Sequence, residues 1–289
     1  MQAASSLSHQ SVYQLVTETV IKQLESGVAP WRKPWRTELP CNLITGREYR
    51  GINPFLLAPQ GYGSRYWLTL NQANKLGGHI RKGEHSSIVT FWKIGDEKIV
   101  TDADGDERKS RPFLLRFYRV FNIEQTEGIA DKLGLGNASP RVPSIEQCEA
   151  IVSGMPNRPN IIQDGRAWYR PSTDTVGIPS RTAFHSAEDY YSTLFHELTH
   201  STGHSSRVGR EEIQKLNEFG SESYSKEELV AELGAALLCG VTGIGPKTIE
   251  NSASYLKAWI DVLKSDTRMV VFAASQAQKA ADYIQGVRP

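Results

Sequence analysis

The stretch Ser192-Thr-Leu-Phe-His-Glu-Leu-Thr-His-Ser-Thr-Gly203 contains two histidines four residues apart, with a glutamate directly after the first. In a helix, side chains four residues apart lie on the same face, one turn above the other. His196 and His200 could therefore bind one Zn²⁺ ion, and Glu197 could take a proton from a water molecule on that ion. Gly203 suits the end of such a helix. The spacing predicts a metal-dependent hydrolytic site. The alternative is an ordinary amphipathic helix whose histidines are exposed or hydrogen-bonded.

A catalytic zinc site needs a third protein ligand and an open position for water. Residues 225–239 have apolar side chains at helical spacing and carry Glu228 and Glu232 four residues apart, so both belong to one helix face. A carboxylate on an otherwise apolar face is costly unless a cation or a metal pairs with it. We therefore expect Glu228 to be the third ligand and Glu232 to accept the free N–H of a ligating histidine, with the reverse assignment open. Glu227 is expected on the exposed side.

His204 is the other candidate ligand. The residues after His200 begin like the longer motif His-Glu-x-x-His-x-x-Gly-x-x-His, but Ser206 stands where that motif has its third histidine. His204 also lies beyond the glycine that should end the helix. We expect it to cap the helix or to line the cleft.

Two features near this site suggest substrate contacts. Residues 173–179 are typical of a strand, and an extended peptide could pair with its edge at residues 176–178. A phenol, Tyr224 or Tyr255, could stabilise the oxyanion of the reaction, although the sequence positions neither of them.

The N-terminal part of the chain is basic and rich in aromatic residues. The net charge of the whole chain is +1, but residues 28–95 hold ten Lys or Arg against three Asp or Glu, a balance of +7, together with nine aromatic side chains. Cations that follow phosphates and rings that stack on unpaired bases are typical of a groove for single-stranded nucleic acid. The alternative is that the rings form core and the cations form a solvated face.

The position of each ring in the chain separates these two interpretations. Rings inside apolar runs are expected in the core, namely Phe55, Trp67, Phe91 and Trp92. Rings in loops beside Arg, Lys, Gly or Pro are expected to bind, namely Trp31, Trp35, Tyr49 and Tyr62. The residues expected to contact the nucleic acid are Trp31, Arg32, Lys33, Trp35, Arg36, Arg47, Tyr49, Arg50, Arg81 and Lys82.

The length of 289 residues and the element pattern predict an α+β chain of two domains. Residues 1–128 alternate short strands with short helices, and residues 129–144 have the Gly and Pro content of a linker or covering loop. Residues 145–289 are mostly helical, with a small antiparallel sheet. A helix is expected at 11–26, where Ser11 can cap its start and Gly27 can end it.

The composition also bears on location. The chain has no apolar run long enough to span a membrane, and its first residues lack the basic and apolar regions of a secretion signal. Its three cysteines are scattered, with no Cys-x-x-Cys pair, which argues against a disulfide framework. We expect a cytoplasmic protein with no membrane partner.

Taken together, the motifs resemble a known family, the ArdC-type antirestriction proteins. The segments similar to the N-terminal domain of that family are residues 24–35, 46–53, 67–78 and 81–84, and those similar to its zincin domain are 196–204 and 227–233. The resemblance implies a plasmid-borne protein of the bacterial cytoplasm that protects incoming DNA from restriction. It further implies a first domain that binds single-stranded DNA and a second that is a zincin-like metallopeptidase acting on a protein substrate or restriction-system target.

The same resemblance carries the family's metal ligands over to His196, His200 and a glutamate within 227–233. Zn²⁺ is the expected ion, with another divalent ion such as Mn²⁺ as the alternative. Whether protection requires proteolysis does not follow from any residue. The second hypothesis is therefore a shielding protein that binds single-stranded DNA and does not need its metal site for that role.

Overall fold

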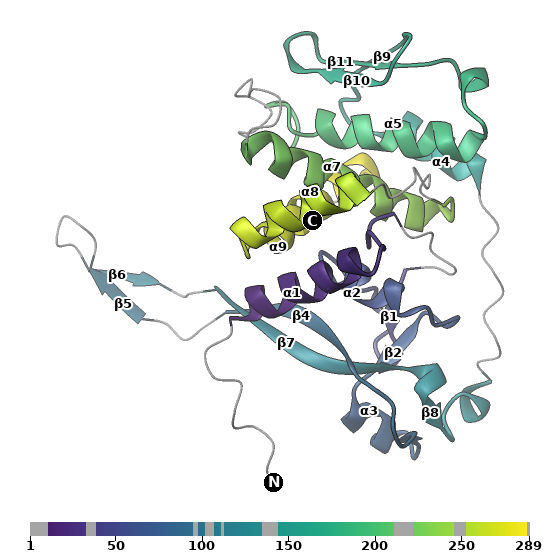
Figure 1. The fold of residues 1–289 in the computed structure, drawn as a ribbon, viewed down its shortest axis with the longest axis vertical. Coiled ribbons are helices and arrows are strands. Elements are labelled where there is room, and N and C mark those ends of the chain that lie inside the picture. Colours follow the sequence, from purple (N-terminus) through teal and green to yellow (C-terminus); the bar gives the residue numbers. More distant parts are fainter. Residues whose placement is uncertain are drawn as a thin grey trace.

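A computed structural model describes residues 11–32, 39–94, 98–101, 107–110, 113–134, 144–210, 222–245 and 253–287. The N-terminal half is built around a sheet, and the C-terminal half is a stack of helices with a small sheet at its far side (Figure 1). The two halves lie directly against each other through helices α1, α8 and α9. The α+β class expected from the sequence is confirmed.

The sheet of the N-terminal half has four strands in the order β1-β2-β7-β4. Its strands are β1 (Cys41–Asn42), β2 (Tyr66–Leu68), β7 (Phe113–Asn122) and β4 (Ser87–Ile94). β1 pairs parallel with β2, and the other two pairings are antiparallel. Beyond the long β4–β7 pair, a two-stranded hairpin of β5 (Lys98–Thr101) and β6 (Glu107–Ser110) extends away from the body (Figure 1).

Short elements complete this half. They are α2 (Asn53–Leu57), η1 (Ala58–Gln60), α3 (Leu70–Lys75), the paired strands β3 (His79–Ile80) and β8 (Thr126–Glu127), η2 (Ile123–Gln125) and η3 (Asp131–Leu133). α3 begins with a capping box in which the Thr69 hydroxyl accepts from the Gln72 backbone N–H while the Gln72 side chain accepts from the Thr69 N–H. These two hydrogen bonds satisfy backbone donors that the first turn of a helix leaves unpaired.

Helix α1 (Val12–Glu25) has the boundaries that its sequence indicates. The Ser11 hydroxyl accepts a hydrogen bond from the Gln14 N–H at its start, and Gly27 follows its end with a φ of +85°, a conformation that glycine adopts without strain. Its buried face, which includes Val16 and Val20, packs mainly against α8 and α9 of the other half. An element of the predicted first domain therefore covers the helices of the second.

The C-terminal half contains five described helices around a common core. They are α4 (Ile145–Gly154), α5 (Ala187–Ser201), α7 (Glu222–Thr242), α8 (Ala253–Ser265) and α9 (Met269–Ile284), with the one-turn elements η4 (Pro171–Thr173) and η5 (Arg181–Ala183). α7 lies against both α5 and α9. None of the described helices is both long enough and apolar enough to cross a lipid bilayer.

The small sheet has the strand order β10-β11-β9, with β9 (Asn160–Gln163), β10 (Trp168–Arg170) and β11 (Thr175–Ile178). Two details differ from expectation. β10 pairs antiparallel with β11 on one side and β9 pairs parallel with it on the other, so the sheet is mixed rather than antiparallel. β11 is the buried central strand, so the predicted addition of a peptide to its edge is wrong.

One core cluster contains side chains from both halves. Val20, Leu24 and Trp31 share it with Leu233 of α7 and Trp259 of α8. Two smaller clusters lie within the N-terminal half, around Trp67 and around Leu68. The predicted boundary at residues 129–144 thus divides the sequence into two segments whose side chains form a common core.

Candidate metal centre

Helices α5 and α7 bring two imidazoles and one carboxylate together. Nε2 of His200 lies 3.2 Å from Nε2 of His196. The carboxylate of Glu228 lies 3.6 Å from Nε2 of His196 and 3.5 Å from Nε2 of His200. The three ligand-type atoms all lie within 4.8 Å of one another. Two nitrogens and one oxygen so placed are the donor set of a zinc site.

Close packing of the two helices makes this approach possible. Gly234 of α7 faces Thr199 of α5, and a Cβ at Gly234 would lie 2.5 Å from Thr199 Cγ2 and 2.8 Å from its hydroxyl oxygen. Thr199 lies between the two histidines in the sequence, and its hydroxyl donates to the Phe195 carbonyl within α5. Glycine at 234 therefore sets the distance between the helix that carries the histidines and the helix that carries Glu228.

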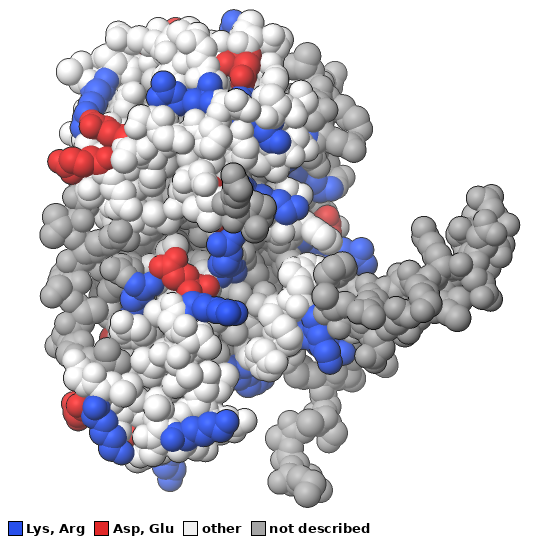
Figure 2. Space-filling view, turned by 180° about the vertical axis from the view of Figure 1, so that it is seen from behind, with Lys and Arg blue, Asp and Glu red and all other residues white. Residues whose placement is uncertain are grey.

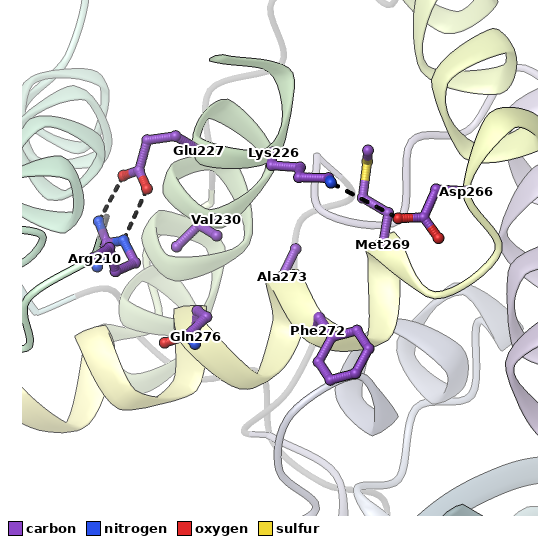
Figure 3. Close-up of a pocket in the computed structure, with 9 residues that line it drawn as sticks. All are labelled: Arg210, Lys226, Glu227, Val230, Asp266, Met269, Phe272, Ala273 and Gln276. Carbon is purple, nitrogen blue, oxygen red and sulfur yellow. Dashed lines mark hydrogen bonds and ion pairs between the residues drawn. The ribbon is translucent and has the colours of Figure 1, made fainter. Parts of the chain in front are cut away.

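The second nitrogen of His200 is held by Glu227. The distance from His200 Nδ1 to Glu227 Oε1 is 3.0 Å, and both side chains are almost fully buried. Arg210 occupies both oxygens of the same carboxylate, with Nη2 at 2.6 Å from Oε1 and Nε at 2.8 Å from Oε2 (Figure 3). Arg210 also donates to the hydroxyl of Thr202 and the carbonyl of Thr199 at the end of α5. The Nδ1–H of His200 can thus donate to an anchored carboxylate, which leaves Nε2 toward Glu228.

The predicted role of Glu232 beside a ligating histidine was wrong, and so was the exposed position expected for Glu227. Glu227 and Glu232 are five residues apart on α7, so their side chains point about 140° apart. Glu227 turns toward α5 and Arg210, and Glu232 turns toward another neighbour. Glu232 accepts hydrogen bonds from Arg32 Nη2 at 2.7 Å and from the Tyr255 hydroxyl at 3.1 Å. Arg210 could not be predicted from the sequence, because nothing in its spacing links it to Glu227.

A cavity of about 240 Å³ borders the Arg210–Glu227 pair, on the side where α7 meets α9 (Figure 3). Its wall is apolar at Val230, Met269 and Ala273. Lys226 lies 4.0 Å from Asp266 at its rim.

The charges at the centre stabilise one another. Burial alone would lower the pKa of His200, but hydrogen bonds and charge from Glu227 and Glu228 raise it to about 10. Burial alone would raise the pKa of each carboxyl, but Arg210 and His200 hold the pKa of Glu227 below its usual value, and the two histidines do the same for Glu228. Both carboxylates are therefore ionised at neutral pH and available to cations.

Glu197 lies beside this centre without belonging to the triad. Burial raises the pKa of its carboxyl, the charges of His196 and His200 oppose that rise, and Glu228 adds to it. A carboxyl with a raised pKa is suited to accept and return a proton near neutral pH.

The centre is open to solvent on one side. The side chains of His196 and Glu228 are 24% and 28% exposed, whereas that of His200 is 11% exposed. Among the residues that the structure describes, no fourth His, Cys, Asp or Glu joins the triad. The described residues thus supply three donors and leave one side accessible, whereas a structural zinc site is normally closed by four protein ligands.

The other residues expected near the site lie elsewhere. His204 Nδ1 is 2.8 Å from the hydroxyl of Ser206, and His204 stands outside the triad. The hydroxyl of Tyr255 donates to Glu232 and accepts from Trp31, so it is not directed at the triad. The side chain of Tyr224 lies outside the described residues.

The predicted DNA contacts at Trp31 and Arg32 were wrong. Trp31 is 1% exposed, packs edge-on against Trp259 with ring centroids 5.7 Å apart, and donates its Nε1–H to Tyr255. Arg32 lies 3.8 Å from the centre of the Tyr255 ring and pairs with Glu232. This loop segment is buried because the helices of the C-terminal half cover it. Lys33, Trp35 and Arg36 lie outside the described residues.

The remaining predicted contacts fall into two groups. All four arginine and lysine side chains are exposed, namely Arg47, Arg50, Arg81 and Lys82. Two of them form ion pairs, Arg50 with Asp282 and Arg81 with Glu84. Two rings are half-buried and pack against the small cluster around Trp67, namely Tyr49 and Tyr62. On the face shown in Figure 2, Lys and Arg side chains are spread over both halves of the described surface rather than gathered in one stripe.

The rings expected in the core also divide. Phe55 and Trp67 are buried as predicted. Trp92 is 43% exposed and meets Tyr13 edge-on, so its predicted burial was wrong. Phe91 is half-buried and stacks on the exposed ring of Tyr118.

The helical half and its triad of two histidines and a glutamate are typical of zincin-like metallopeptidases. Comparison with known proteins agrees with this class. Residues 146–276 match the zincin-like metallopeptidase family. Residues 10–121 match the N-terminal domain of the anti-restriction factor ArdC.

Solved structures extend the match over nearly the whole chain. The metal-free crystal structure of the antirestriction protein ArdC from the R388 plasmid is 36% identical, with a TM-score of 0.74 over 97% of this chain and 100% of that one. The Mn(II)-bound structure of the same protein is 35% identical, with a TM-score of 0.71 over 96% and 98%. The chain belongs to the ArdC antirestriction family.

Curated relatives contain a segment similar to this chain, either as most of the protein or as a small part of a longer one. The chain is 32% identical to the uncharacterized protein y4eC of Sinorhizobium fredii (strain NBRC 101917 / NGR234), over 94% of this chain and 91% of that protein. It is also 36% identical to a DNA primase TraC of Escherichia coli over 94% of its own length, but it spans only 27% of that protein. It spans 20% of a second TraC.

Proposed function

We propose that the protein is a metal-dependent peptidase of the His-Glu-x-x-His type that also binds single-stranded DNA, and that it protects incoming plasmid DNA from restriction in the bacterial cytoplasm. The observation that carries the enzymatic part is the convergence of His196, His200 and Glu228 beside Glu197. Membership of the ArdC family supports the antirestriction part.

The donor set fits a divalent ion. Nε2 of each histidine and a carboxylate oxygen of Glu228 would hold it. The ion would polarise the peptide carbonyl and make water more acidic. Zn²⁺ suits these donors, and the Mn(II)-bound relative supports Mn²⁺ as the alternative.

The chain's own residues would carry the proton transfers. Glu197 takes a proton from the attacking water and gives it to the leaving amine nitrogen; burial raises the pKa of its carboxyl, which makes it a better proton acceptor than a solvated glutamate. Glu227 holds the His200 ring in place through Nδ1, and Arg210 holds Glu227.

A second function, binding of single-stranded DNA, is assigned to the N-terminal half. The match of residues 10–121 to the ArdC N-terminal domain and the balance of +7 in residues 28–95 support it. Binding through phosphates should weaken as salt rises. If the bound strand alone gives protection, the protein is a shield and the metal site is not needed for its biological role.

Replacing Glu197 by Gln separates these possibilities. The change keeps the shape of the side chain but removes the proton acceptor, so peptide hydrolysis should fall by roughly 100- to 10,000-fold. Metal content and affinity for a single-stranded oligonucleotide should stay the same. Glu188→Gln makes the same chemical change in the first turn of α5 and should leave all three properties unaltered.

The biological role follows from a second measurement on the same variant. Transfer of unmodified plasmid into a restricting host is compared with wild type and Glu197→Gln. Loss of protection supports the peptidase as the working part, and full protection assigns that role to DNA shielding. Hydrolysis that persists in the variant refutes the mechanism.

A further inference from the structure

Strands β4 and β7 carry a pair of stacked rings, one of which is exposed to solvent. The rings of Phe91 and Tyr118 are parallel within 5°, with centroids 4.4 Å apart. Tyr118 is 55% exposed, and Phe91 belongs to none of the core clusters of the described residues. A large aromatic side chain exposed to this degree leaves apolar surface in water, which a binding role would explain.

The strand register places two cations beside these rings. Phe91 is paired with Arg116, and Lys93 is paired with Leu114. Because alternate residues of a strand point to the same side, Phe91, Lys93, Arg116 and Tyr118 share one face. Lys93 and Arg116 are both exposed.

The opposite face of the same strands is largely occupied. Ile88 and Leu115 pack against the large core cluster, and Trp92 meets Tyr13 of α1. On the face with the stacked rings, Val89 and Val120 are buried in the small cluster around Trp67. Beyond them on the same face, Tyr118, Lys93 and Arg116 are exposed and Phe91 is half-buried. Cross-strand stacking alone would stabilise the sheet, but it would not require exposed cations beside the rings on both strands.

We propose that Phe91 and Tyr118 form a stacking platform for unpaired bases, with Lys93 and Arg116 bound to the flanking phosphates. This inference rests on the proposed binding of single-stranded DNA and gives that function a site in place of Trp31 and Arg32. Paired bases have no free face to offer such rings, so the platform discriminates against duplex. Any base can stack, so it shows little sequence preference.

The rings are tested with a short fluorescent oligothymidylate and the full chain. Tyr118→Ala should weaken binding by roughly 5- to 100-fold, whereas Tyr118→Phe, which keeps the ring, should bind as wild type does. Trp92→Ala removes a ring of similar exposure from the neighbouring position on the other face and should leave affinity unchanged. A melting curve of each variant shows that the fold is retained.

The cations are tested by the dependence of affinity on salt. The double change Lys93→Ala and Arg116→Ala should reduce the slope of log K against log salt by roughly 1.4, because each phosphate contact on a single strand contributes about 0.7. Lys257→Ala removes one positive charge from an exposed pair on α8 and should leave the slope as it is.

The outcomes separate this inference from the function on which it rests. If wild type does not bind the oligonucleotide at all, the proposed DNA binding fails. If wild type binds but folded Tyr118→Ala binds equally well, or if Tyr118→Phe loses as much affinity as Tyr118→Ala, the platform is overturned while DNA binding stands. Equal losses for Trp92→Ala and Tyr118→Ala would also overturn it, because the site would then not be confined to this face.

Discussion

Arg210 is the residue on which the orientation of the metal centre depends most. It is buried and meets both oxygens of Glu227, which in turn meets His200. We expect Arg210→Met to leave a buried carboxylate without its cation. The free energy of unfolding should fall by about 3–5 kcal/mol. Metal affinity should fall roughly 10- to 100-fold, because Glu227 would lose its contact with Arg210 and would hold the His200 ring less firmly.

Chelator competition measures the metal affinity of Arg210→Met, and urea unfolding measures its stability. Arg181→Met is the control, since Arg181 is a half-exposed arginine of the same half whose partner Glu149 is also exposed. Removing an exposed pair costs about 0–1 kcal/mol. An Arg210→Met protein that binds metal as tightly as wild type would show that Glu227 needs no anchor.

Residue spacing predicts which side chains can share a face, but not what lies opposite that face. The spacing of His196 and His200 indicated a shared ligand position, and both imidazoles lie where this predicts. Glu227 and Glu232 could not be assigned in this way. Their partners Arg210 and Arg32 come from distant segments that reach α7 only through the tertiary fold.

At the scale of elements, the packing of α5 on α7 depends on Gly234. An exposed helix position would gain up to about 1 kcal/mol from Gly→Ala. Here the added Cβ would meet Thr199 at 2.5 Å, so overpacking should cost roughly 1–3 kcal/mol. We expect Gly234→Ala to be less stable than wild type and to bind metal more weakly, because it moves Glu228 away from the histidines.

A double change shows whether the cause is this contact. Thr199→Ala removes the clashing atoms, so Gly234→Ala together with Thr199→Ala should recover most of the lost stability and metal affinity, measured by the same titrations. Gly154→Ala, at the end of α4 with nothing near its added Cβ, should be neutral or slightly stabilising. If the double change is as weak as the sum of the single changes, the two side chains do not interact.

Element boundaries were easier to predict than element partners. The start of α1 at Ser11 and its end before Gly27 follow from local hydrogen bonds and backbone conformation, which the sequence determines directly. Its apolar face also follows from periodicity, but nothing local indicates that this face packs on α8 and α9. The burial of Trp31 is a consequence of the same packing, so the loop position of that residue was misleading.

At the scale of the whole molecule, side-chain contacts join the N-terminal half to α7, the helix that carries Glu228. One turn beyond Glu228, Glu232 binds Arg32, and Trp31 fills the space beside Trp259. Arg50 adds a second connection through Asp282 of α9. The N-terminal segment is therefore part of the structure that supports the metal centre, as well as part of the half assigned to DNA.

This arrangement predicts opposite effects for two ring substitutions. Trp31→Ala should lower the free energy of unfolding by roughly 3–5 kcal/mol, because it empties a buried site and leaves the Tyr255 hydroxyl without its donor. Added metal should restore part of the loss, since it binds the folded form. The affinity of folded Trp31→Ala for single-stranded DNA should equal that of wild type, measured at low urea with the folded fraction known. Tyr118→Ala should instead keep its stability and lose DNA affinity. If Trp31→Ala keeps its stability and loses DNA affinity, Trp31 is a DNA contact and the two halves are not joined through it.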